Sequence, residues 1–144
     1  MEKILLVLLA FMLVLVIVFG GITLLNVNNF EQMKEYIDTF KTEGVESELT
    51  PSKDEHGNWY FTTDEDFKVL HLTDIHLSGG FIQAESDKKA INAVAAMVWA
   101  EDPDLVIVTG DISYAIGLGG TINNSYAHGM FIRLMENLGV YWTV

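Results

Sequence analysis

The sequence contains no cysteine. That absence excludes disulfide bonds, thiolate metal sites and a lipid-modified cysteine. Basic residues are also scarce, because 8 lysines and arginines stand against 20 aspartates and glutamates, for a formal net charge of −12. A surface this acidic repels the phosphates of nucleic acids, so we expect no DNA or RNA binding. We attribute the acidity mainly to solubility.

Charged residues are missing altogether from residues 4–25. The run is apolar apart from Gly20, Gly21 and Thr23, and a helix of this length rises about 33 Å, enough to cross the hydrocarbon core of a membrane. A buried core helix would normally carry a polar face, which this run lacks. The sequence therefore predicts a transmembrane anchor at residues 1–27. A signal peptide cleaved near Val18–Gly20 is the alternative that stays open.

The residues flanking this run predict its orientation. Lys3 precedes it, whereas Asn26, Asn28 and Glu31 follow it. The excess of positive charge on the cytoplasmic side of membrane proteins favours a cytoplasmic N-terminus. We therefore expect a single-pass protein of the cell membrane, with its soluble domain outside the cytoplasm.

Residues 28–57 are predicted to link the anchor to the domain. Residues 29–43 have the apolar spacing of an amphipathic helix that ends near Gly44. This helix is either a stalk at the membrane surface or a helix that packs on the domain, and the pattern does not separate the two. Residues 46–57 are polar, include Pro51 and Gly57, and predict a loop. We place the domain at residues 58–144.

The domain is predicted to open with strands at residues 58–62 and 67–73, paired as a hairpin. The second strand is apolar on both faces except at His71, which is typical of a strand covered on both sides. A helix capped by Ser86 then runs to Asp102–Pro103, and a strand occupies residues 104–109. A second helix at residues 125–138, closed by Gly139, leads into a strand at residues 140–144. The predicted apolar stripes of the two helices are Ile91, Val94, Ala95, Val98 and Trp99, and Met130, Phe131, Leu134 and Leu138.

The predicted fold class is α/β, with an N-terminal transmembrane helix followed by a strand–helix–strand–helix–strand (βαβαβ) unit. Such a unit forms a parallel sheet with right-handed crossovers, and ligands bind at the carboxyl ends of its strands. Asp74 and His76 follow one strand, and Asp111 follows the next strand after one helix. We therefore expect these three residues at one edge of the sheet.

Two carboxylates close together repel each other unless a cation lies between them. Oxygen and nitrogen donors without sulfur suit Mn, Fe or Zn ions. Two such ions bridged by Asp111 would activate a hydroxide and bind phosphate oxygens for in-line attack. Alone, Asp74 and His76 could instead make local hydrogen bonds, and Asp111 could cap a turn.

The segments "HLTDIHLSGG" and "PDLVIVTGDIS" resemble the calcineurin-like metallophosphoesterases, whose first two motifs are Asp-x-His and Gly-Asp. The resemblance covers about residues 67–144. It implies a β-sandwich flanked by helices and a two-metal hydrolase of phosphomonoesters or phosphodiesters. It also implies that Asp74 and His76 bind the first metal, that Asp111 bridges both metals, and that Gly110 lets the backbone turn beside them.

The family's third motif, Gly-Asn-His-Asp/Glu, supplies a ligand and a histidine often assigned as the general acid, and later histidines complete the centre. None of these occurs in the 144 residues, and His56, His71 and His128 are not placed to replace them. We therefore expect a truncated, inactive chain that binds at most one ion weakly. The loop at residues 115–124 is predicted to form part of the substrate wall or a disordered connector.

Three functions compete at this stage. The first is a membrane-anchored phosphoesterase of which this chain is the N-terminal portion, acting on a phosphate ester that the sequence does not identify. The second is a non-catalytic, membrane-anchored protein that associates with itself through the open edge of its sheet or binds one metal ion weakly. The third is a small membrane protein whose span is its function.

Overall fold

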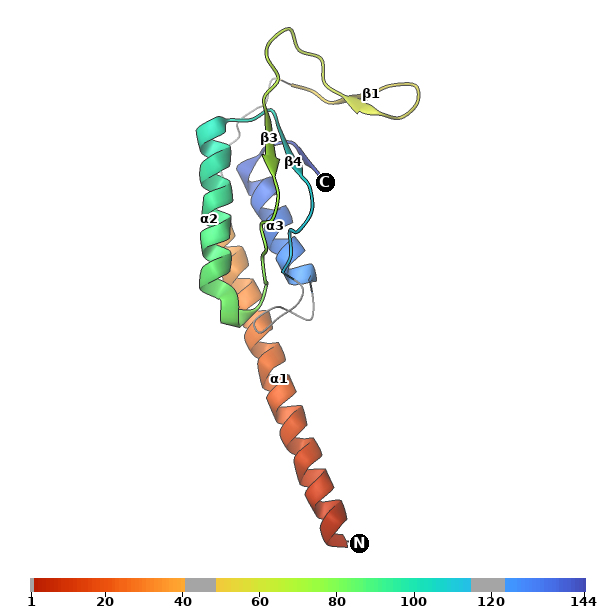
Figure 1. The fold of residues 1–144 in the computed structure, drawn as a ribbon, viewed down its shortest axis with the longest axis vertical. Helices are drawn as coiled ribbons and strands as arrows, with labels where there is room; N and C mark the ends of the chain where they lie inside the picture. The colour runs from red at the N-terminus through yellow and green to blue at the C-terminus, as the bar shows by residue number, and fades with distance from the viewer. Residues whose placement is uncertain (1, 41–48, 115–123) are drawn as a thin grey trace.

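A computed structural model describes residues 2–40, 49–114 and 124–144 (Figure 1). The predicted loop at residues 115–124 and the end of the predicted helix at residues 29–43 lie mostly outside these ranges. The helices are α1 (Glu2–Asp38), α2 (Ala84–Glu101) and α3 (Ser125–Leu138), with a short 3₁₀ turn, η1 (Phe81–Gln83). The strands are β1 (Ser52–Lys53), β2 (Trp59–Tyr60), β3 (Val69–Leu72), β4 (Leu105–Val108) and β5 (Trp142–Thr143).

The main sheet confirms the predicted βαβαβ unit. Its strands lie in the order β3-β4-β5, and both pairs are parallel. Leu72 lies opposite Val108, and Val106 lies opposite Trp142. Because both crossovers step in the same direction along the sheet, crossovers of one hand place α2 and α3 on the same face.

The core lies between this face and the three helices (Figure 1). Leu72, Val106 and Val108 are buried against the helices, whereas Val69 and His71 on the other face of the sheet are exposed. The prediction that β3 is covered on both sides is therefore wrong for the described residues. An apolar run predicts a strand within a sheet, but it does not predict whether one or both faces of that strand are covered.

Helix α1 differs from the prediction because it continues unbroken from Glu2 to Asp38. No strong helix breaker lies between the apolar run and residue 29, so a separate helix does not start there. Asn29, Met33 and Ile37 are buried in the domain, while residues 4–14 and 16–25 are exposed. Of the two interpretations left open for residues 29–43, the helix that packs on the domain is the one observed.

A bidentate ion pair fixes the end of α1 to α3. The Arg133 guanidinium donates to both oxygens of Asp38, at 2.6 and 2.7 Å. The Asn137 side chain donates to the Ile37 carbonyl oxygen at 3.0 Å. The last third of α1 is thereby part of the domain, so the domain is carried directly on the apolar helix.

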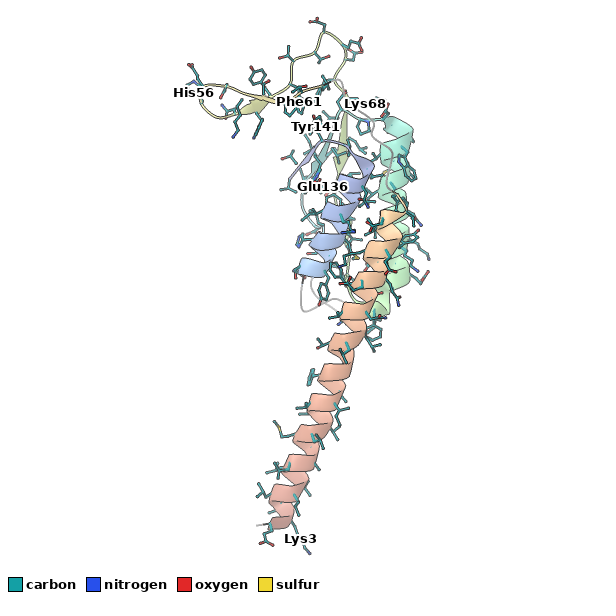
Figure 2. The ribbon with its side chains drawn as sticks, turned by 180° about the vertical axis from the view of Figure 1, so that it is seen from behind. Lys3, His56, Phe61, Lys68, Glu136 and Tyr141 are labelled. Atoms are coloured by element: carbon teal, nitrogen blue, oxygen red, sulfur yellow. The ribbon has the colours of Figure 1, made fainter. Side chains whose placement is uncertain are left out.

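The predicted hairpin between residues 58–62 and 67–73 is wrong. β2 instead pairs antiparallel with β1, so that Lys53 lies opposite Trp59, inside a segment predicted to be a loop. The Asp54 side chain favours this shorter hairpin because its Oδ1 accepts the backbone N–H groups of His56 and Asn58 at 2.9 and 2.8 Å. Figure 2 shows His56 at the tip of this hairpin, which projects away from the helices.

The predicted helices are present with small differences. α2 begins at Ala84 after η1, so Ser86 lies inside the helix and does not cap it. Trp99 is 51% exposed, while the other four residues of its predicted stripe are buried. α3 has the predicted bounds, ends at Gly139 with φ +69°, and buries its whole predicted stripe.

Candidate metal centre

The candidate site lies where the chain leaves β3 and β4. Backbone hydrogen bonds continue beyond the strands, because the His76 N–H donates to the Asp111 carbonyl oxygen at 2.9 Å and the Leu77 N–H donates to that of Ile112 at 2.8 Å. These bonds draw the segment after β3 against the segment after β4. The three residues singled out in the sequence are therefore brought together, although they lie on two separate segments.

The side chains of Asp74, His76 and Asp111 converge at this point. The His76 Nε2 atom lies 3.7 Å from Asp74 Oδ1 and 3.5 Å from Asp111 Oδ2. One potential ligand atom from each of the three residues lies within 4.8 Å of the other two. Two ligands about 2.1 Å from one ion lie about 3.0–3.4 Å apart at angles of 90–110°. The observed distances of 3.5 and 3.7 Å, and of up to 4.8 Å within the group, are wider, so the side chains would have to rotate toward one another to hold a single ion.

The charges of the site also fit a cation. Within the described parts of the chain, the ion pairs of Asp74 and Asp111 are with His76 alone, and His76 is positive only when protonated. A neutral imidazole leaves two carboxylates without an opposing charge, which a metal ion would supply. The three side chains are 47–71% exposed, so an ion can reach them from solvent.

The backbone of the site is held in the left-handed region. Asp74, His76 and Asp111 have φ values of +55°, +54° and +42°, and Gly110 has φ +78°. Aspartate and histidine tolerate this region better than most residues, but it still costs free energy. Such strain persists where the surrounding structure imposes it, and it concentrates at functional sites. Gly110 therefore lies at a turn that suits glycine, as the resemblance implies.

Two threonines next to the site make hydrogen bonds, and one of them contacts Asp74. The Thr73 hydroxyl lies 2.7 Å from Asp74 Oδ2 and 2.8 Å from the Thr109 carbonyl oxygen, and its single proton can be donated to one of them at a time. The Thr109 hydroxyl makes a short hydrogen bond with His71 Nε2 across the exposed face of the sheet. His71 thus ties β3 to the end of β4 and is not among the converging donors.

The other histidines lie away from the centre, as predicted. His128 is exposed on α3, and its Nδ1 lies 3.0 Å from the Asn124 carbonyl oxygen. His56 belongs to the tip of the β1–β2 hairpin (Figure 2). Neither is a member of the group of converging donors found in the described residues.

The sequence analysis missed Asp87, which holds the loop that follows His76. Its carboxylate accepts the backbone N–H groups of Ser78 and Gly79 at 2.8 and 2.9 Å. Asp87 is buried in the first turn of α2, and this burial raises the pKa of its carboxyl, although both hydrogen bonds act in the opposite direction. The sequence did offer a signal for this role. Asp87 follows a glycine-rich loop and falls early in the predicted helix, and the backbone N–H groups of such a loop need acceptors.

Gly79 lets this loop contact the start of α3. It has φ +71°, and a Cβ atom at this position would lie 2.8 Å from the Ala127 nitrogen and 2.9 Å from the Tyr126 Cβ. No other residue type fits without moving α3. The loop beside the candidate centre is thus fixed by a buried acceptor on one helix and by direct contact with another.

A small cavity of about 280 Å³ opens beside His76. Tyr114 lines it, with its ring 5.9 Å from the His76 ring. Gln83 and Asp87 also line it. The cavity is polar and adjoins the converging donors, so a phosphate-sized group has space next to the candidate centre.

The sequence that forms this site also matches a known protein family. A sequence model of the calcineurin-like phosphoesterases matches residues 67–144, which is more than half of the chain. The chain belongs to this family. Membership suggests a metal-dependent hydrolase of phosphate esters, and the candidate site offers three oxygen and nitrogen donors of the kind that such chemistry uses. Neither the curated proteins nor the solved structures yielded a match to the chain.

Proposed function

We propose that this chain is the metal-binding portion of a membrane-anchored phosphoesterase that hydrolyses phosphomonoesters or phosphodiesters. Residues 1–27 form its anchor, residues 28–57 the juxtamembrane segment, and residues 58–144 the first part of the phosphoesterase domain. α1 supports an anchor, because it is long and apolar enough to cross a membrane by length and composition. The convergence of Asp74, His76 and Asp111 at one sheet edge carries the proposal.

The proposed ligands are Asp74 and His76 for one ion and Asp111 between two ions. Mn, Fe or Zn ions, when bound, supply Lewis acidity to phosphate oxygens and lower the pKa of water. The chain's own part is to hold the donors in place. Thr73 orients Asp74, and Asp87 fixes the loop after His76. The domain would be completed as a helix-flanked β-sandwich, as the family resemblance implies.

We propose further that these 144 residues bind at most one ion weakly and do not turn over substrate. The Gly-Asn-His motif and the later histidines that the family resemblance implies do not occur among them. Without those groups, the second ion lacks most of its ligands and the leaving oxygen lacks a proton donor.

Calorimetric titration with Mn²⁺ tests the metal site. We expect Asp111→Asn to weaken binding at least about 10-fold, because loss of a metal ligand exceeds the 10- to 100-fold effect typical of its outer partners. Asp66→Asn, in an exposed loop after β2, is the matched control and should leave binding unchanged. Equal affinities of the wild type and Asp111→Asn would refute the site.

Turnover of an aryl phosphate tests the activity. We expect none from the 144 residues, and metal-dependent hydrolysis from a chain extended through a Gly-Asn-His segment. Turnover by the 144 residues that Asp111→Asn abolishes would show that the missing motif is not required.

A second candidate function is non-catalytic: a membrane-anchored protein that self-associates or binds one metal ion weakly. The exposure of the three donors favours it, because an exposed three-ligand site holds an ion loosely. An extended chain that binds Mn²⁺ but hydrolyses no phosphate ester would support this alternative.

A further inference from the structure

Helix α1 leaves the domain at the edge that carries the candidate metal centre. The Asn26 side-chain oxygen accepts the backbone N–H of Phe81 at 3.1 Å. Asn26 directly follows the charge-free run, and Phe81 is only five residues beyond His76. Figure 1 shows β3 and β4 running toward the side from which the apolar half of α1 projects, and Figure 2 shows Lys68, just before β3, at the opposite end of the body from Lys3.

The height of the site above the apolar run follows from two contacts. The Phe30 ring stacks on the Tyr126 ring with centroids 4.6 Å apart, and Gly79 lies directly against Tyr126. Phe30 lies about 7.5 Å along the helix from Leu25, at 1.5 Å per residue. His76 is three residues from Gly79 and so at most about 11 Å from it.

The shorter route runs through Asn26, the residue after the run, whose side chain is hydrogen-bonded to Phe81. His76 is five residues from Phe81 and so at most about 18 Å from it. The donors therefore lie near the end of the apolar run, on the side facing it.

An exposed apolar side chain and the cavity lie on the same side. Ile82 in η1 is 67% exposed, although the backbone N–H of its neighbour Phe81 is hydrogen-bonded to Asn26 of α1. An exposed isoleucine beside the end of a membrane span is suited to the headgroup boundary of a bilayer. The next residue, Gln83, lines the cavity that His76 also lines. One short segment thus borders both the expected membrane surface and the space beside the metal ligands.

We propose that the substrate is a phosphate ester carried by a lipid of the bilayer that α1 spans. This inference rests on the proposed phosphoesterase function. A lipid headgroup diffuses within the layer that the carboxyl edge of the sheet faces, so it is concentrated on the side of the donors. The rigid continuity of α1 from the span to the core keeps this edge toward the membrane.

Fluorescence quenching tests the placement, and the absence of cysteine allows single-site labelling of the full chain. Ile82→Cys and Glu101→Cys would each carry a bimane label, in vesicles of phosphatidylcholine that include a headgroup nitroxide lipid. Glu101 ends α2, about 27 Å from the start of that helix. We expect several-fold stronger quenching at position 82 than at position 101. Equal quenching, or stronger quenching at position 101, would overturn the inference.

A binding measurement tests the source of the phosphate. With a label on Tyr114→Cys and Mn²⁺ present, phosphatidic acid in the vesicles should change the fluorescence at a bulk concentration where glycerol 1-phosphate does not. An equal response to the soluble ester, or no response to the lipid, would overturn the inference. The quenching at position 82 requires no metal, so a chain that fails to bind Mn²⁺ but shows this quenching would refute the proposed function and not the placement.

Discussion

The loop that follows His76 and the loop at the tip of the β1–β2 hairpin are built in the same way, one near the point where α1 leaves the domain and the other at the opposite end. In each, an aspartate accepts backbone N–H groups: Asp87 from Ser78 and Gly79, and Asp54 from His56 and Asn58. Each loop also contains a glycine with positive φ, +71° at Gly79 and +87° at Gly57.

Their surroundings differ completely. Asp87 is 1% exposed, and its burial raises the pKa of its carboxyl. Asp54 is exposed, and hydrogen bonds, foremost from the Asn58 side chain, lower the pKa of its carboxyl. Nothing lies within 4 Å of a Cβ added at Gly57, while one at Gly79 meets α3. Similar local chemistry therefore fixes the loop beside the candidate centre to two helices, but only shapes a turn at the other end.

The largest expected difference is between the two glycines. Gly79→Ala should lower the free energy of unfolding by about 2–5 kcal/mol, because left-handed backbone strain of about 1–2 kcal/mol adds to overpacking of about 1–3 kcal/mol. Denaturant unfolding followed by circular dichroism measures it.

Gly57→Ala is the matched control, because it adds no overpacking. Its backbone strain sets an upper limit of about 1–2 kcal/mol on the global loss, since the hairpin projects from the body. If both substitutions cost the same, the contact of Gly79 with α3 would not contribute to stability.

Substitution of Asp87 should lower the free energy of unfolding more than substitution of Asp54, as for the two glycines. Asp87→Asn replaces one acceptor oxygen with an N–H₂ donor that faces a buried N–H, so we expect a loss of about 1–3 kcal/mol in the free energy of unfolding. Asp54→Asn should cost less, because water can satisfy the exposed N–H groups of its turn. The same unfolding measurement compares them, and a larger loss for Asp54→Asn would reverse the comparison.

The opposite pKa shifts predict opposite pH dependences. The pKa of Asp87 is raised on folding, so its contribution is fully present below the pKa of the unfolded chain and falls as the pH rises through the folded value. The pKa of Asp54 is lowered, so its contribution is present above the unfolded value and is lost as the pH falls through the folded one.

Unfolding free energies of the wild type, Asp87→Asn and Asp54→Asn between about pH 2 and pH 7 cover the range in which aspartates titrate. The difference between the wild type and Asp87→Asn should shrink with rising pH, and that between the wild type and Asp54→Asn should shrink with falling pH. The same slope for both differences would contradict the opposite shifts.

Two parts of the structure, helix α3 and the convergence of the candidate ligands, could be predicted from the sequence. The apolar period and Gly139 predicted α3 with its exact bounds, because a helix is specified by residues close to one another. The convergence of Asp74, His76 and Asp111 was predictable as well, since parallel strands bring their carboxyl ends to one edge.

The rest depended on partners distant in the sequence. The hairpin was assigned to the wrong pair of strands because β2 could pair with either neighbour, and the Asp54 side chain favours β1. Asp87 was missed because its acceptor role depends on the loop at residues 78 and 79, which reaches it only after folding. The exposed face of β3 could not be foreseen, since an apolar strand does not report how many layers cover it.

The smallest expected effect is at the exposed hairpin. The Lys53 ammonium lies 4.5 Å from the centre of the Trp59 ring, and Trp59 is 66% exposed. Exposed cation–π pairs contribute about 0.5–1 kcal/mol to the structure that holds them. Because the hairpin is small and projects from the body, Lys53→Gln should shift the fluorescence of Trp59 while changing the global free energy of unfolding by less than about 0.5 kcal/mol. A larger global loss would show that the hairpin is coupled to the core, and the two ends of the molecule would then differ less than their burial indicates.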